Sequence, residues 1–201
     1  MIRTIISDLG KVILWFDNDI FFRKIAAYCS CPEEKIRDVV HRRGEMVELF
    51  DTGRMTPQQF YSRATSELDA SVSYEDFFAA YCDVFWLNPP VVELYKKLKG
   101  KYPLILLSNT DVVRFSFIRE KFPEILIFEA TLLSFEVGVM KPHPRIYQEA
   151  LERAKAEAPA CVFIDDMEEN IRGAADLGIK TILYKPETDL EKELRAVGLD
   201  F

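Results

Sequence analysis

The sequence predicts an α/β fold of three layers, in which helices cover both faces of a parallel sheet. Five short apolar runs are continuous rather than alternating, which is typical of strands buried on both faces. Amphipathic helix patterns with short connections lie between several of these runs, as the crossovers of parallel strands require. One long stretch after the first run contains helix patterns alone. It predicts a helical insertion into the α/β unit.

The predicted strands are short and rich in branched apolar residues. In chain order they are Thr4–Ser7, Leu104–Leu107, Leu126–Glu129, Cys161–Ile164 and Thr181–Tyr184. The predicted helices have proline at their beginning or glycine after their end, the usual signals of helix limits. They are Val91–Leu98, Pro144–Lys155 and Asn170–Leu177.

Residues 18–87 form the insertion and contain no convincing strand. Thr56-Pro57-Gln58-Gln59 predicts a helix that begins with a capping box and with proline at its first position. Ser73 is placed to begin another helix, which carries Phe77 and Phe78. We therefore predict a core domain of residues 1–17 and 88–201, with an all-helical cap domain of residues 18–87 inserted after the first strand.

Composition excludes several functional classes. The chain has 201 residues, 49% of them apolar, and a net charge of −7 without any dense run of Lys or Arg, so neither a nucleic acid nor a membrane is an expected partner. There is no signal-peptide pattern and no apolar run long enough for a membrane span, which predicts a cytoplasmic protein. The four cysteines match no zinc spacing, and we expect them to be reduced thiols. The sequence makes no prediction about oligomeric state.

Polar residues follow three of the predicted strands directly. Asp8 follows the first strand, Ser108-Asn109-Thr110 the second, and Asp165-Asp166 the fourth, while Lys141 precedes the helix that leads to that fourth strand. Each has a plainer explanation by itself: a turn, a helix cap or a solvated surface charge. If the three strands are neighbours, however, their ends meet in one crevice, where open α/β sheets bind ligands.

The three aspartates would then repel one another. Two carboxylates 4 Å apart repel by about 1 kcal/mol in water and about 4 kcal/mol at a partly shielded site, so three together call for a cation. A site of few oxygen ligands, with room for waters and phosphate oxygens, suits Mg²⁺.

These residues resemble the four ordered motifs of the haloacid dehalogenase (HAD) superfamily. The matching segments are Asp8-Leu-Gly, Ser108-Asn-Thr, Lys141-Pro and Asp165-Asp166 with Asn170 four residues later. The resemblance implies a Rossmann-like core with a small helical cap. The residues in these motifs are most similar to those of glucose-1-phosphatase-like members of the superfamily. Receiver domains combine similar residues, but their acidic pair precedes the lysine, so the order here excludes them.

The resemblance also implies roles for these residues. Asp8 would attack phosphorus and form an aspartyl-phosphate, with Ser108 and Lys141 as further catalytic residues. Ser108, Asn109 and Lys141 would bind the phosphoryl group of a small phosphorylated metabolite. Asp8, the backbone carbonyl of Gly10, Asp165 and Asp166 would hold Mg²⁺. Asn170 is expected to tether the loop of the last motif.

Gly10 departs from the pattern of family phosphatases, which carry at this position a second aspartate that donates and accepts protons. Its absence predicts a preference for leaving groups that depart as stable anions. Three functions remain open: a phosphatase, a HAD-like hydrolase of another bond such as a carbon–halogen bond, and a non-catalytic binding or regulatory protein. We rank the phosphatase first.

Overall fold

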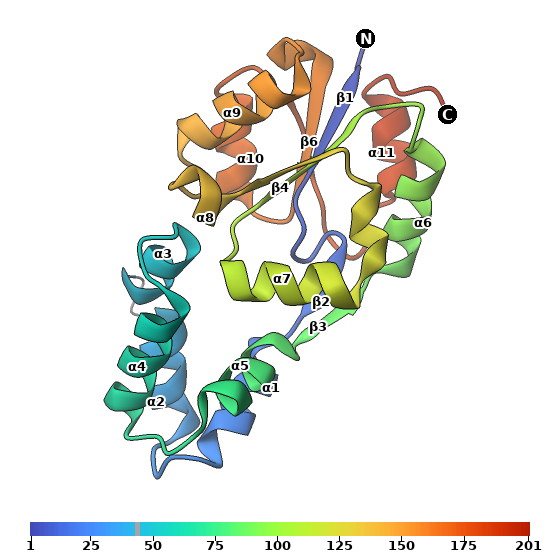
Figure 1. Cartoon of the computed structure of the whole chain (residues 1–201). Coiled ribbons are helices and arrows are strands. Elements are labelled where there is room, and N and C mark those ends of the chain that lie inside the picture. The colour runs from blue at the N-terminus through green and yellow to red at the C-terminus, as the bar shows by residue number, and fades with distance from the viewer. Residues whose placement is uncertain (43–44) are drawn as a thin grey trace.

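The computed structural model describes residues 1–42 and 45–201, and a five-stranded parallel sheet lies at its centre (Figure 1). The strands follow the order β5-β4-β1-β6-β7, so β1 lies between β4 and β6. Every residue of β1, β4 and β6 is buried, as their continuous apolar sequences predicted. The predicted α/β fold is confirmed. The strands are β1 (Thr4–Ser7), β4 (Leu104–Ser108), β5 (Ala130–Leu133), β6 (Cys161–Asp165) and β7 (Lys180–Leu183).

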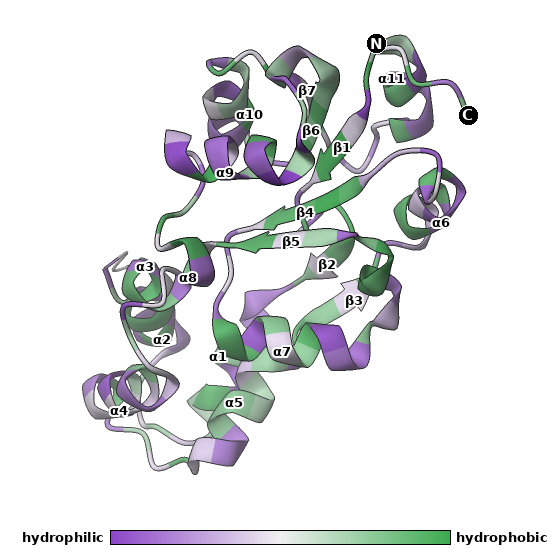
Figure 2. Cartoon of the chain, turned by 45° about the horizontal axis from the view of Figure 1, so that its top comes forward, coloured by the Kyte–Doolittle hydropathy of each residue, from purple (hydrophilic) through white to green (hydrophobic). Residues whose placement is uncertain are grey.

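Helices cover both faces of this sheet, and successive side chains of β1 pack against the helices on opposite faces. Ile5 packs in the cluster that includes α6 and α11, whereas its neighbour Ile6 packs in the cluster that includes α9 and α10. In Figure 2 the central strands such as β4 are coloured mostly hydrophobic, whereas the helices combine hydrophobic and hydrophilic stretches. The elements of the core outside the sheet are α6 (Pro89–Leu98), α7 (Val112–Lys121), α8 (Ser134–Val137), α9 (Pro144–Ala154), η3 (Ala158–Ala160), α10 (Glu168–Ala175) and α11 (Leu190–Ala196).

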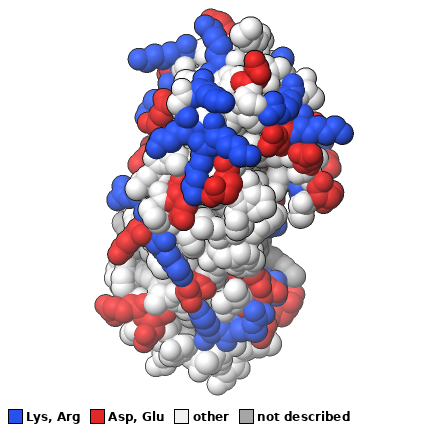
Figure 3. All heavy atoms as spheres, turned by 90° about the vertical axis from the view of Figure 1, so that its right-hand side faces the viewer, with Lys and Arg blue, Asp and Glu red and all other residues white. Residues whose placement is uncertain are grey.

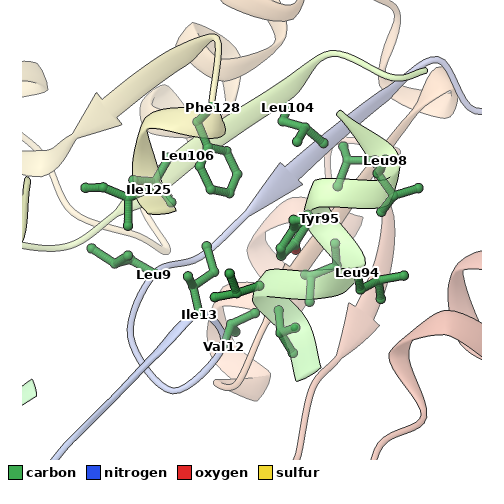
Figure 4. Close-up of a cluster of buried hydrophobic side chains, with 14 of the residues drawn as sticks. Leu9, Val12, Ile13, Leu94, Tyr95, Leu98, Leu104, Leu106, Ile125 and Phe128 are labelled. Carbon is green, nitrogen blue, oxygen red and sulfur yellow. The ribbon is translucent and has the colours of Figure 1, made fainter. Parts of the chain in front are cut away.

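The loop after β1 is anchored by apolar side chains (Figure 4). Leu9, Val12 and Ile13 are at most 3% exposed and pack in one cluster with α6 and β4. Burying such a side chain contributes about 1.5–3 kcal/mol, so this loop has a fixed path. Tyr95 on α6 donates a hydrogen bond from its hydroxyl to Ser7 Oγ at 2.7 Å, and Ser7 Oγ donates to the Asp8 carbonyl at 2.8 Å. The backbone of Asp8, which follows β1, is thereby connected to α6 through Ser7.

The strand predicted at Leu126–Glu129 was wrong. Those residues lie in and after a 3-10 helix, η2 (Pro123–Ile127), and the edge strand β5 begins only at Ala130. Ile125 and Phe128 are buried whereas Leu126 is 60% exposed, so the buried positions are three residues apart, which is the period of a 3-10 helix. Pro123 at the first position of η2 also favours a helical turn over a strand.

In the described part of residues 18–82, five helices and one π-helical turn pack around an aromatic core of their own, and we call this unit the cap. Phe50 and Phe60 stack at a centroid distance of 4.4 Å, and Phe21 meets Phe77 edge to face at 5.5 Å. The predicted capping box is present, because Thr56 Oγ1 accepts from the Gln59 backbone N–H and the Gln59 side chain accepts from that of Thr56. Ser73 caps the next helix as predicted. The elements are α1 (Asn18–Ala26), α2 (Glu33–Arg37), η1 (Asp38–Arg42), α3 (Glu45–Asp51), α4 (Pro57–Leu68) and α5 (Tyr74–Cys82).

A two-stranded antiparallel ribbon joins the cap to the core (Figure 1). It pairs β2 (Leu14–Phe16) with β3 (Phe85–Leu87), and Trp15 lies opposite Trp86. The prediction that residues 18–87 contain no strand was therefore wrong at β3. A strand of three residues is too short for its hydrophobic pattern to be recognised in the sequence.

The surface carries charges of both signs. On the face shown in Figure 3, acidic and basic side chains lie close together over much of the molecule. Among the described residues, no helix is both long and apolar enough to span a bilayer.

Candidate active site

A pocket of about 250 Å³ lies at the carboxyl ends of the central strands. The residue after β1, the last residue of β4 and the residue after β6 all face it, because these three strands are neighbours and parallel. It is the place where an α/β sheet of this kind binds ligands. The cap supplies part of its wall. The polar lining residues are Asp8, Lys11, Asp51, Ser108, Asn109, Thr110, Asp111, Arg114, Lys141, Asp166 and Asn170.

A buried ammonium group holds two carboxylates at the base of this pocket. Lys141 Nζ lies 2.6 Å from Asp8 Oδ1 and 2.7 Å from Asp165 Oδ2, and it donates to the Leu107 carbonyl at 3.0 Å. Burial lowers the pKa of Lys141, but the attraction of Asp8 and Asp165 outweighs this and raises its pKa above the ordinary value. The lysine therefore stays charged. Burial, with a contribution from the charge of Asp165, raises the pKa of Asp8 to about 7 against the opposing pull of Lys141.

The third carboxylate lies in the loop after β6. One oxygen atom from each of Asp8, Asp165 and Asp166 falls within 4.8 Å of the others. Asp165 is fully buried and does not line the pocket, since its oxygens accept from Met167 N, from Asn170 Nδ2 and from Lys141. Asp166 is half-buried and lines it, and burial together with the charge of Asp165 raises its pKa. The expected tether by Asn170 is present as its hydrogen bond to Asp165.

This donor set fits a hard divalent cation. Lys141 contacts two of the three carboxylates directly, while Lys11 and Lys185 attract Asp166 without an ion-pair contact, so oxygen atoms of the cluster remain that suit oxygen-preferring Mg²⁺. Asn170 Oδ1 is buried, lines the pocket and has no hydrogen-bond partner among the described residues. Such an orphaned acceptor suits a water molecule in the shell of the cation.

Ser108 and Asn109 enter the pocket from the end of β4. Ser108 is 3% exposed, and the contact of its hydroxyl with the neighbouring Asn109 carbonyl is long, at 3.5 Å. Asn109 is committed to Lys141: its Oδ1 accepts from the Lys141 backbone N–H at 2.8 Å, and its Nδ2 donates to the Lys141 carbonyl at 2.9 Å. The serine hydroxyl is available to a ligand, while the asparagine chiefly positions the lysine.

Gly10 lies close against an aromatic ring. A Cβ atom at this position would lie 3.0 Å from Cε1 of Phe16, so a side chain could enter only if the ring moved. Phe16 lines the pocket and packs against Phe85 with ring centroids 5.9 Å apart. The aromatic ring therefore occupies the space beside Gly10.

The sequence did not identify the residues on the cap side of the pocket. Tyr81 of α5 donates its hydroxyl hydrogen to Asp111 Oδ2 at 2.9 Å, and the Arg114 guanidinium lies 3.9 Å from the centre of the Tyr81 ring. Arg114 Nη2 donates to Asn18 Oδ1 at 2.9 Å, whereas its Nε is buried without a partner among the described residues. Asp51, the last residue of α3, also lines the pocket. Only Asp111 had a sequence signal, as a cap before a helix pattern.

The sequence of His41-Arg42-Arg43 in the cap favours a solvated helix face over a site for a substrate anion. Arg43 lies outside the described residues, and nothing is described of the side chains of His41 and Arg42. Neither interpretation is tested.

Asp111 should stabilise both α7 and the contact between cap and core. Its Oδ1 accepts from the backbone N–H groups of Val113 and Arg114, and its Oδ2 accepts from Tyr81. We expect Asp111→Ala to lower the free energy of unfolding by about 2 kcal/mol through the lost helix cap. Tyr81→Phe should cost about 1 kcal/mol. Urea unfolding of the two single variants and the double variant measures these effects, and strictly additive costs would contradict a direct coupling between the residues.

Comparison with known proteins decides the family. The family model of haloacid dehalogenase-like hydrolases matches residues 2–178. The chain belongs to this family. Bifunctional epoxide hydrolase 2 of Rattus norvegicus is 37% identical over 137 residues, which cover 66% of this HAD-like chain and 25% of the rat protein. This chain thus matches about a quarter of that relative's length.

Two matches from one bacterium cover nearly all of this HAD-like chain. D-ribitol-5-phosphate phosphatase of Bacteroides thetaiotaomicron is 24% identical over 204 residues, which cover 98% of both chains. A crystal structure of a HAD family enzyme from the same organism, in complex with magnesium and inorganic phosphate, superposes with a TM-score of 0.85. That enzyme is 25% identical, and the match covers 97% of this chain and all of the other.

Proposed function

We propose that this HAD-like hydrolase is a magnesium-dependent phosphatase of small phosphorylated metabolites, working through an aspartyl-phosphate on Asp8. The observation that carries the proposal is the contact of Asp8 Oδ1 with Lys141 Nζ at the base of the pocket. Asp8 Oδ2 makes no hydrogen bond within the described part of the chain, so one oxygen is held while the other can react. A phosphatase relative of matching length supports the reaction class.

Asp8 would act as the nucleophile. Its carboxylate oxygen attacks phosphorus, the bond from phosphorus to the leaving-group oxygen breaks, and the leaving group takes up a proton. Water then attacks phosphorus in the aspartyl-phosphate, releases inorganic phosphate and restores the Asp8 carboxylate. Two smaller barriers replace one large barrier.

Lys141 and Ser108 would bind the phosphoryl group. The ammonium group is fixed by Asp8, Asp165 and the Leu107 carbonyl, so it is in place before the phosphoryl charge shifts and requires no reorganisation. The Ser108 hydroxyl can donate to a phosphoryl oxygen. Asn109 would contribute through its remaining amide hydrogen and by holding the backbone of Lys141.

Asp8, Asp166 and the carbonyl of Gly10 would hold Mg²⁺ directly, with Asp165 as a further carboxylate of the same cluster. When bound, the ion would offset negative charge on the phosphoryl oxygens and on the three carboxylates. In the Bacteroides enzyme, magnesium and inorganic phosphate occur together in one complex, which supports this assignment.

Residues 18–87 would act as a cap domain on the core domain of residues 1–17 and 88–201. The cap contributes Asp51 to the wall of the pocket, and the ribbon of β2 and β3 connects it to the core. Closure of such a cap excludes water from the reaction and selects the substrate. A sugar phosphate suits the polar wall formed by Asp51, Asp111 and Arg114.

Phosphate release from p-nitrophenyl phosphate, with Mg²⁺ and with excess EDTA, tests the proposed reaction. We expect Mg²⁺-dependent release, and a panel of metabolite phosphates would then rank the natural leaving groups. A protein that binds Mg²⁺ but releases phosphate from no ester would instead be a binding or regulatory protein. Release of halide from a 2-haloacid without phosphatase activity would indicate the dehalogenase alternative.

A further inference from the structure

The proposed phosphatase reaction, on which this inference rests, requires a proton for the leaving group, and Gly10 has no side chain to supply it. The pocket itself contains the candidate donors. Among the described lining residues, the carboxylic acids are Asp8, Asp51, Asp111 and Asp166.

Three of these four acids are already committed. Asp8 pairs with Lys141 and would be the nucleophile. Asp166 belongs to the acidic cluster that fits a cation. Asp111 accepts hydrogen bonds from two backbone N–H groups and from the Tyr81 hydroxyl, which occupies both of its oxygens. The Asp51 side chain makes no hydrogen bond or ion pair within the described ranges 1–42 and 45–201, and it lies half-buried in the wall of the pocket.

The position of Asp51 is fixed by a contact between the cap and the core. Two residues after it, Gly53 has a positive φ of 69° and lies so close to α8 that a Cβ atom there would clash with the Phe135 carbonyl oxygen. Figure 1 shows α3 next to α8. The end of α3 is therefore pressed against the core, and Asp51 faces the pocket from the cap while Asp8 faces it from the sheet.

The surroundings of Asp51 suit proton transfer in both directions. Burial, with a contribution from the negative charge of Asp111, raises the pKa of Asp51 to about 7, and Arg114 opposes the shift. An acid with a pKa near the working pH is the most effective proton donor and acceptor, because both forms are well populated.

We propose that Asp51 is the general acid and base of this enzyme. Its carboxyl proton passes to the leaving-group oxygen as the bond between that oxygen and phosphorus breaks. The resulting Asp51 carboxylate then takes a proton from the water that attacks phosphorus of the aspartyl-phosphate on Asp8. Inorganic phosphate leaves, and both aspartates return to their starting states.

Rates on a series of aryl phosphates test this role, because the need for an acid grows with the basicity of the leaving group. 2,4-Dinitrophenolate departs without a proton, whereas unsubstituted phenolate does so poorly. We expect Asp51→Asn to lower kcat/KM about 10²- to 10⁴-fold for phenyl phosphate and very little for 2,4-dinitrophenyl phosphate. Since the Asp51 side chain makes no hydrogen bond within the described structure, the isosteric variant should fold. Asp69→Asn, an exposed aspartate of the same cap, is the matched control and should behave as the wild type.

The second step gives an independent measurement. With 2,4-dinitrophenyl phosphate, Asp51→Asn should release one equivalent of dinitrophenol in a burst and then turn over slowly, because the attacking water has lost its base. An equal loss across the whole series would mean that Asp51 binds a substrate group or supports the cap, and it would overturn the proposal. The proposal would also be overturned if kcat/KM of Asp51→Asn depended on the basicity of the leaving group as it does in the wild type. If the wild type releases phosphate from no member, the proposed function fails and this inference fails with it.

Discussion

Asp8→Asn should abolish turnover, with a loss of at least about 10⁴-fold in kcat, the scale seen when a catalytic nucleophile is removed. An amide cannot form the aspartyl-phosphate, while its shape and its hydrogen bond to Lys141 remain possible in the same space. Phosphate release at saturating substrate measures the effect. Asp69→Asn again serves as the control on a remote carboxylate. Wild-type turnover in Asp8→Asn would exclude covalent catalysis by this residue.

The same variant should not lose stability in metal-free buffer. Burial raises the pKa of Asp8 from 3.8 in the unfolded chain to about 7, so its ionised form is disfavoured in the folded state. The contribution of the protonated group to stability is complete below pH 3.8 and is lost as the pH rises to about 7. Asparagine does not ionise. We therefore expect Asp8→Asn to unfold at a higher temperature than the wild type at pH 8, and a lower one would contradict the proposed electrostatics.

Removing Mg²⁺ should lower kcat about as much as Asp8→Asn does. Activity should be lost in excess EDTA and restored when Mg²⁺ is added back. Asp165 and Asp166 are expected to differ in role: Asp166 is a direct ligand of Mg²⁺, and Asp165 supports the cluster. Loss of a residue that supports a metal ligand costs about 10- to 100-fold in affinity or activity, so loss of a direct ligand should cost more. Asp166 lines the pocket, whereas Asp165 is held by Lys141, Asn170 and Met167. Asp166→Asn should therefore lose more activity than Asp165→Asn.

Asp165→Asn should instead lose more stability. Both oxygens of Asp165 accept hydrogen bonds, from Lys141, from Asn170 and from the Met167 backbone N–H, so an amide nitrogen there would face buried donors at a cost of about 1–3 kcal/mol. Asp8 differs, because its Oδ2 makes no hydrogen bond within the described residues and an amide nitrogen can take that position. Calorimetric titration with Mg²⁺ and thermal unfolding of both variants separate the effects. Full activity in EDTA, or tighter Mg²⁺ binding by Asp166→Asn, would contradict the assignment.

The sequence predicted the fold well where one local pattern determines the structure. Buried strands such as β1 and β6 have continuous apolar runs, and the helix that begins after Thr56 has a capping box. It predicted poorly where tertiary context decides. The run from Ile125 to Phe128 is as apolar as a strand, yet it forms a 3-10 turn beside the edge strand β5.

The residues of the candidate site also fall into those that a local sequence pattern predicts and those that only the folded chain brings together. Asp8, Ser108 and Asp166 each lie at or next to the end of a strand, so their convergence followed from the expected sheet. Asp51 and Arg114 could not be found in this way, because the cap helix α3 and the core helix α7 are distant in the sequence and approach the pocket only in the folded chain. Asn109 shows a further limit, because nothing in the sequence indicated that its side chain also holds the backbone of Lys141.

The contact between Gly10 and the Phe16 ring means that a substitution at position 10 depends on the residue at position 16. An aspartate at position 10 would bring its Cβ within 3.0 Å of Phe16, so that substitution is accommodated only if the aromatic side chain moves or becomes smaller. Phe16 in turn packs against Phe85 on the partner strand of the ribbon. A lineage that carries this aromatic pair gains a proton donor at residue 10 only if the Phe16 ring shifts by a few tenths of an ångström or if residue 16 changes as well. Single substitutions would therefore tend to preserve Gly10, and selection for faster proton transfer would act on the surroundings of Asp51 instead.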